Sequence, residues 1–313
     1  MMVNYLFTNY KWRVEIMQKV AILSDDTCDL PSELIEKYNI TLIPIRIIFS
    51  DKVYDSCGSA GELTLEEYYS KVAEEIPTTS TPSPGMLVKG FEKALTNGDS
   101  VIGVFVSDKM SPIYSNSKKI LQEYFPTKNI HIFDSKVTSV ALGAIVLEIA
   151  IMAAADHTQD EILEKTQEFL DQVHFAGIMS TMENLVRTGR VPRTKKFLAD
   201  TFRIKPIVKF TDGEVTVQGK IRADDKLIIN QLKKYGQQIL THINGETNHI
   251  VIGHTRWPEA AREIADYIEQ YNTKKKTIII QETGAIVANF VGKKTLTIGY
   301  IGEYKEKWLS EVK

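Results

Sequence analysis

The sequence has few cysteines, no marked excess of either charge and no long apolar run. Its two cysteines, Cys28 and Cys57, lie outside any CxxC motif and outside any Cys/His cluster with zinc spacing. This excludes a disulfide framework and indicates a reducing compartment, so we expect a cytoplasmic protein without a metal site. The 38 Lys and Arg residues against 40 Asp and Glu residues argue against a nucleic-acid partner bound through bulk positive charge.

No segment has the roughly 18 uncharged apolar residues that a membrane span needs. The most apolar one, residues 137–155, is interrupted by Ser139 and Glu148. The first 18 residues lack the continuous apolar stretch of a signal peptide. We therefore expect no integral membrane segment, and we interpret residues 1–18 as a leader or extension.

The first half of the remaining chain alternates between strand and helix patterns. Strands are predicted at residues 20–23, 41–49, 101–106 and 130–133, and helices at 31–38, 68–76, 83–98, 113–125 and 137–155. Such alternation is typical of a parallel sheet covered by helices on both faces. We expect a Rossmann-like N-terminal α/β domain over residues 19–157.

The second half has a different pattern. The pair Asp212-Gly213 separates two β-rich runs and suits a type I′ hairpin turn. Further strands are predicted at 175–180, 249–254, 278–281 and 295–300, and helices at 158–173, 182–193, 224–242 and 258–271. We expect a C-terminal α/β domain with mixed or antiparallel strands over residues 158–313.

The sequence lacks the common cofactor and catalytic motifs, including G-x-G-x-x-G after a strand, the P-loop, H-E-x-x-H and G-x-S-x-G. We therefore expect no cofactor. Instead, hydroxyl residues cluster where strands end, around Thr79, Ser111 and Ser135. Loops at the carboxyl ends of parallel strands form the ligand crevice of such sheets. The pattern favours an anion-binding crevice built from hydroxyls and helix N-termini.

Several segments, taken in order, resemble the DegV family of bacterial fatty-acid-binding proteins. The segment at residues 79–83, T-S-T-P-S, resembles the family's T-S-Q-P-S. Weaker matches lie at residues 24–30, 111–114, 134–143, 185–191, 205–222 and 283–284. The resemblance implies a two-domain DegV-like fold without catalysis. It also implies a buried tunnel for a long-chain fatty acid, presented to a fatty acid kinase as FakB-type carriers do.

The resemblance also implies site residues. Thr79 and Ser111 match the residues that hold the carboxylate. The other candidate ligand-binding residues in the matching segments are Ser80, Ser135, Glu282 and Thr283. Glu282 stands where the family has His, and a Glu facing a carboxylate repels it unless one of the two is protonated. Arg190 and Arg222 match residues involved in docking to the kinase.

Two alternatives stay open. Glu282 motivates a divergent binder of another small amphiphile or a cation-bearing ligand. The less favoured alternative is an acyl or phosphoryl enzyme with Ser111 or Thr79 as nucleophile, for which His254 is only a remote candidate base.

Overall fold

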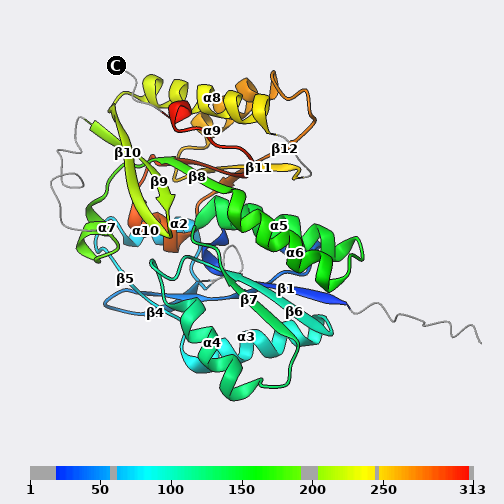
Figure 1. Cartoon of the computed structure of the whole chain (residues 1–313). Helices are drawn as coiled ribbons and strands as arrows, with labels where there is room; N and C mark the ends of the chain where they lie inside the picture. The colour runs from blue at the N-terminus through cyan, green and yellow to red at the C-terminus, as the bar shows by residue number, and fades with distance from the viewer. Residues whose placement is uncertain (1–18, 57–61, 192–203, 244–246, 310–313) are drawn as a thin grey trace, which may run out of the picture.

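The structure is a computed structural model, and it describes residues 19–56, 62–191, 204–243 and 247–309. These residues form two large sheets and one small sheet, with helices between and around them (Figure 1). Among them, no helix is long and apolar enough to cross a bilayer.

The first large sheet has four parallel strands in the order β2-β1-β6-β7. They are β1 (Val20–Asp25), β2 (Thr41–Ile43), β6 (Ser100–Phe105) and β7 (Ile130–Asp134). Every residue of β1 and β6 is buried, which explains why both strands read as continuous apolar runs. The predicted parallel sheet is confirmed.

The second large sheet is mixed, in the order β10-β9-β8-β13-β11-β12. Its strands are β8 (Val173–Ile178), β9 (Ile204–Thr211), β10 (Glu214–Arg222), β11 (His249–His254), β12 (Thr277–Glu282) and β13 (Leu296–Ile301). Only the β11–β12 pair is parallel. The helices α8 (Asp225–His242) and α9 (Pro258–Glu269) pack together over one face, and the short η2 (Glu306–Leu309) packs on α8. The predicted second α/β unit with mixed strands is confirmed.

The helix α5 (Ser139–Ala154) lies between the two large sheets (Figure 1). On one side it packs against β1 and β6, and on the other against β8, β11 and β13. Its first twelve residues are all buried, as expected for a helix that is apolar all round. The helices α3 (Pro84–Asn97) and α4 (Ile113–Tyr124) cover the other face of the first sheet, so that sheet has helices on both faces as predicted.

Side-chain caps start three of the helices predicted from the sequence. Ser83 caps α3, and Thr64 forms a capping box with Glu67 at α2 (Leu65–Lys71). The same box, from Thr158 and Glu161, starts α6 (Gln159–Gln172), which packs along α5. Each box satisfies two backbone N–H groups that have no partner inside the helix. The remaining short helices of the first half are α1 (Ser32–Lys37) and η1 (Asp26–Cys28).

The β9–β10 hairpin reaches the first half of the chain. Asp212 and Gly213 have φ angles of 49° and 84°, which confirms the predicted type I′ turn. The Ser107 hydroxyl, just beyond β6, donates a hydrogen bond of 2.7 Å to the Gly213 carbonyl. The hairpin tip is therefore attached to a loop at the carboxyl end of the first sheet.

Several short elements differ from the sequence-based expectations. The β-rich run 41–49 is split by Pro44 into β2 and β3 (Ile45–Ile48). Together with β4 (Val53–Ser56) and β5 (Thr78–Ser80), β3 forms a small sheet in the order β4-β3-β5. The strands β4 and β5 and the helix α10 (Ala285–Val291) were not predicted, and α7 (Glu183–Arg187) is shorter than expected. They are three to seven residues long, too short for a periodic signal.

The boundary near His157 separates the strands of the two large sheets, since all those of the first sheet precede it and all those of the second follow it. The helix α5 nevertheless packs on both sheets. The division into residues 19–157 and 158–313 stays a prediction. The leader, residues 1–18, lies outside the described residues.

Candidate functional site

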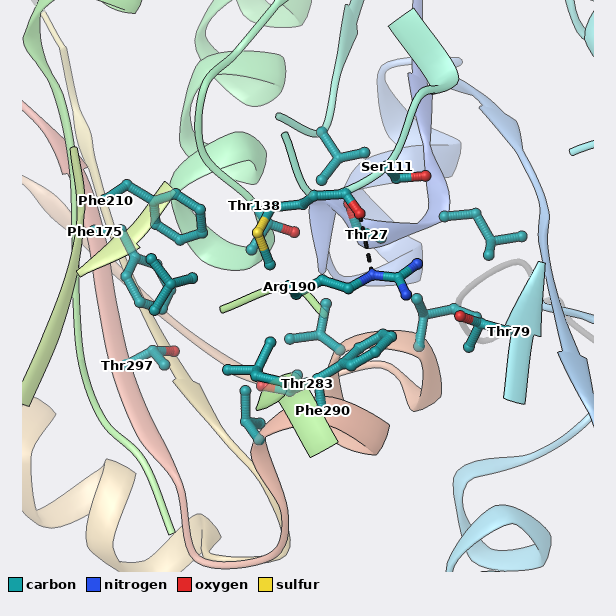
Figure 2. A pocket seen from close by; sticks show the side chains of 18 of the residues that line it. Thr27, Thr79, Ser111, Thr138, Phe175, Arg190, Phe210, Thr283, Phe290 and Thr297 are labelled. Atoms are coloured by element: carbon teal, nitrogen blue, oxygen red, sulfur yellow. Dashed lines mark hydrogen bonds between the residues drawn. The ribbon is translucent and has the colours of Figure 1, made fainter. Parts of the chain in front are cut away.

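A pocket lies where loops at the carboxyl ends of the first sheet meet β8, β9, β13 and α10 of the second half (Figure 2). Its empty volume is about 790 Å³, including the part open to solvent. Apolar side chains line most of it: Ile45, Val106, Met110, Phe175, Met179, Leu185, Phe210, Val215, Ile286, Val287, Phe290 and Val291. The polar lining consists of hydroxyls and one cation: Thr27, Thr79, Ser80, Thr81, Ser111, Thr138, Thr283, Thr297 and Arg190.

Two of the predicted carboxylate-binding hydroxyls lie on one side of this pocket. Thr79 is on β5, paired with Ile47 of β3, and Ser111 is in the loop between β6 and α4. The backbone N–H of Ser111 donates to the Ser107 carbonyl at 3.0 Å, which holds the loop as a turn. Both residues are half-buried. Among the described residues neither side-chain hydroxyl has a hydrogen-bond partner, so both can donate to a ligand.

Arg190 supplies a cation on the same side of the pocket. Its Nε donates to the Met110 carbonyl at 3.4 Å, and its Nη1 donates to the Thr188 carbonyl at 2.9 Å. The guanidinium lies 5.5 Å from the centre of the Phe290 ring. Figure 2 shows it extending toward the side where Thr79 and Ser111 lie. No carboxylate of the described residues is within ion-pair distance of it, so its charge is available to an anionic ligand.

Of the other predicted residues, Thr283 lies in the pocket, whereas Ser135 and Arg222 lie outside its lining. Thr283 lines the pocket, and its N–H donates to the His254 carbonyl at 2.8 Å. Ser135 is buried outside the pocket lining, and its hydroxyl donates to the Val137 carbonyl and accepts from the Val137 N–H. Its hydroxyl therefore stabilises a turn after β7. Arg222 is exposed at the end of β10.

Glu282 is not part of the pocket lining. It ends β12 and borders a second cavity of about 1130 Å³, together with Asp26 and Asp29. The Nε of Arg256 lies 4.0 Å from its carboxylate. A ligand carboxylate held by Thr79 and Ser111 would therefore not face Glu282 within the same pocket.

Buried carboxylates at the end of β1 and just after it hold the two segments that present Thr27 and Val106 to the pocket. Asp25 accepts the Val106 N–H at 2.7 Å and the Thr27 N–H at 2.9 Å. Burial raises the pKa of Asp25, although these bonds oppose the shift. Asp29 accepts from the Ser139 hydroxyl and from the Gly284 N–H, and burial raises its pKa to about 8. Through Asp29, the segment after β1 is therefore hydrogen-bonded to the first residue of α5 and to the N-cap residue of α10.

His254 does not act on the pocket hydroxyls. It is buried, and its Nδ1 accepts the Trp257 N–H at 3.4 Å. Burial lowers its pKa, so the ring is neutral near pH 7. Among the described residues, no His, Asp or Glu side chain hydrogen-bonds to the Thr79 or Ser111 hydroxyl. The described lining can therefore hold an acid through hydroxyls and a cation, and it places no base beside either hydroxyl.

Sequence reasoning missed part of the polar lining. Thr27 and Thr81 lie within segments that resemble the family, although neither was among the predicted site residues. Thr138 lies between β7 and α5, as the N-cap of α5, and belongs to a hydroxyl cluster visible in the sequence. Thr297 lies inside the apolar strand β13 and carries no sequence signal.

Comparisons with known proteins agree with this architecture. A DegV domain-containing protein of Clostridium perfringens is 27% identical over 290 residues, covering 92% of this chain and all of that protein. A DegV family structure from Thermus thermophilus, described by its fatty acid binding, has a TM-score of 0.79 at 22% identity and covers 90% of this chain and 99% of its own. A DegV family structure from Eubacterium eligens, loaded with heptadecanoic acid, has a TM-score of 0.76 at 18% identity, with 91% and 100% coverage.

The family described as "Uncharacterised protein, DegV family" matches residues 19–303, which is nearly the whole chain and both of its large sheets. The chain therefore belongs to the DegV family.

Proposed function

We propose that this protein binds a long-chain fatty acid in the pocket. The carboxylate lies at Thr79, Ser80, Ser111 and Arg190, and the tail lies along the apolar wall. The observation that carries the proposal is the composition of the lining, in which hydroxyls and a single Arg border a wall of aliphatic and aromatic side chains. The fatty acids named for the Thermus thermophilus and Eubacterium eligens structures support the same ligand class.

Tail burial supplies most of the affinity. Each buried methylene contributes about 0.8 kcal/mol, so about ten of them contribute about 8 kcal/mol before the cost of ordering the chain. The hydroxyls and Arg190 then orient the acid and distinguish it from an uncharged amphiphile. A cation-bearing ligand was considered because Glu282 would repel a carboxylate. Since Glu282 borders the second cavity and does not line the pocket, its position supports an acid as the ligand.

The same proposal includes delivery of the acid to a kinase. Thr79, Ser111 and Arg190 are only half-buried, whereas Thr283 and Thr297 are buried. A carboxylate at the half-buried end is accessible to a phosphoryl donor on a partner protein. In this proposal the chain is a carrier without catalysis of its own, which fits the finding that no described His, Asp or Glu side chain hydrogen-bonds to either hydroxyl. The two cysteines support the reducing cytoplasm as its compartment.

Ligand binding is tested with protein made in bacteria. Native mass spectrometry and lipid extraction should detect one fatty acid per chain. After delipidation, Thr79→Val should weaken palmitate binding roughly tenfold, because it removes a hydrogen bond to a charged group. Thr78→Val is the matched control, since Thr78 is exposed on the same strand and does not line the pocket. Empty protein whose melting temperature does not respond to added fatty acids would refute the proposal.

Kinase delivery is tested by mixing the palmitate-loaded chain with ATP and the ATP-binding subunit of a bacterial fatty acid kinase. Acyl phosphate should form only when the chain is present. Arg222→Ala should lower the rate without changing palmitate affinity, because Arg222 lies outside the pocket lining. Arg262→Ala, an exposed change on α9, is the control. Equal rates for the two variants would show that Arg222 is not part of the docking surface.

A further inference from the structure

The pocket contains a buried hydroxyl that has no partner. Thr297, on β13, is 4% exposed, lines the pocket, and has no hydrogen-bond partner for its Oγ1. A buried hydroxyl without a partner destabilises the protein unless a ligand or a water satisfies it. Figure 2 shows this oxygen turned toward the other lining side chains, on the opposite side of the view from Thr79 and Ser111.

The neighbouring strands explain why the hydroxyl has no partner within the sheet. Thr297 is paired with Gly177 of β8 on one side and with Gly253 of β11 on the other. Neither glycine has a side chain that could donate or accept. A Cβ added at Gly253 would lie 2.3 Å from the Thr297 Oγ1, so only glycine leaves room for this hydroxyl.

A second hydroxyl faces the same point. The Thr283 Oγ1 lies 3.4 Å from where a Cβ on Gly253 would be, and Thr283 is 2% exposed. Both threonines line the pocket. Together they form a polar spot in the wall, which we call the distal hydroxyl pair. The methylenes of a saturated tail offer neither a donor nor an acceptor to this pair.

We infer that the acyl chain bound by this protein carries a hydroxyl group well away from its carboxylate, and that Thr297 is the specificity-determining residue that binds it. This inference rests on the proposed function, because the distal hydroxyl pair can contact a tail only if the carboxylate lies at Thr79 and Ser111. A ligand hydroxyl both donates and accepts, so it pairs with Thr297 whichever way that hydroxyl is turned. A site built to hydrogen-bond a substrate hydroxyl discriminates against the analogue that lacks it.

The experiment compares the affinities of the delipidated chain for stearic acid and for 3-, 10- and 12-hydroxystearic acid by calorimetry. At least one of the two mid-chain hydroxy acids should bind roughly three- to tenfold more tightly than stearic acid, the gain from one net hydrogen bond. The 3-hydroxy acid is the control, because its hydroxyl lies beside the carboxylate and should give no such gain.

Two variants assign the preference to Thr297. Thr297→Val keeps the shape but removes the hydroxyl, so it should abolish the mid-chain preference and leave stearic acid binding at least as tight. Thr297→Ser should retain the preference, and it serves as the second test if the valine variant folds poorly.

The outcomes distinguish a failure of this inference from a failure of the proposed function. If stearic acid binds and the mid-chain hydroxyl brings no gain, a water rather than a ligand satisfies Thr297, and this inference alone is overturned. A preference that persists in Thr297→Val overturns it as well. If no acid binds, the proposed function fails and this inference fails with it.

Discussion

Arg190 offers the sharpest test of how the pocket holds an acid. Two of its five N–H donors reach backbone carbonyls, one of them at a long 3.4 Å, and the other three reach no acceptor among the described residues, so they can donate to a carboxylate. A hydrogen bond to a charged group contributes about 1.5–3 kcal/mol. Because Arg190 is half-buried, water screens part of this, and we expect the lower end of the range. Arg190→Met should therefore weaken palmitate binding roughly tenfold.

The assay compares an acid with the corresponding alcohol. Lauric acid and dodecanol share a tail but differ in charge, and each displaces a fluorescent alkyl probe that carries no carboxylate. The wild-type chain should prefer the acid, and Arg190→Met should reduce that preference while leaving alcohol binding unchanged. Arg187→Met is the control, since Arg187 is an exposed Arg three residues earlier in the chain. An unchanged acid preference in Arg190→Met would refute the role of this cation.

Three further predictions follow from the geometry. Glu282→His should leave palmitate affinity within about twofold, since Glu282 borders the second cavity; a large gain in calorimetry would mean that it does face the headgroup. Asp29 keeps its proton up to about pH 8 in the folded chain but loses it near about pH 4 when unfolded. The folded state therefore binds more protons in this interval, and the melting temperature should fall as pH rises from 5 to 8; Asp29→Asn should flatten that fall, and an unchanged pH profile would contradict the assignment. Gly253→Ala places a Cβ 2.3 Å from the Thr297 Oγ1 and 2.8 Å from Val140, so it should destabilise the chain by about 1–3 kcal/mol in denaturant unfolding.

The regular elements could be read from the sequence because each carries a local signal. The apolar runs of β1 and β6, the capping boxes at Thr64 and Thr158, and the Asp212-Gly213 turn all depend on residues close together in the chain. The strand β5 could not be read, because it has only three polar residues and depends on pairing with β3, whose paired residues are 30 or more positions earlier in the chain.

The candidate site was predictable only in part for the same reason. The hydroxyl-rich segments around Thr79 and Ser111 follow recognisable patterns, and the structure brings both to one pocket. The position of Arg190 depends on how α7 packs on α10, which nothing in the Arg-rich segment indicates. Similarly, Thr297 is unusual only because glycines flank it on two other strands. Side chains that meet through long-range packing leave no local pattern.

The helix between the sheets limits how a ligand can enter. Because α5 packs on both large sheets with its first twelve residues buried, a hinge that swung the halves apart would expose that entire apolar surface to water. Entry and exit must therefore use smaller parts of the wall, such as the hairpin tip, which is attached to the loop after β6 by the Ser107–Gly213 hydrogen bond and by an ion pair of Lys109 with Glu214 at 4.0 Å. Under the proposed function, exchange of a bound acid would depend on local opening, and we expect a change at the Gly213–Ser107 contact to alter the release rate more than the affinity at the headgroup.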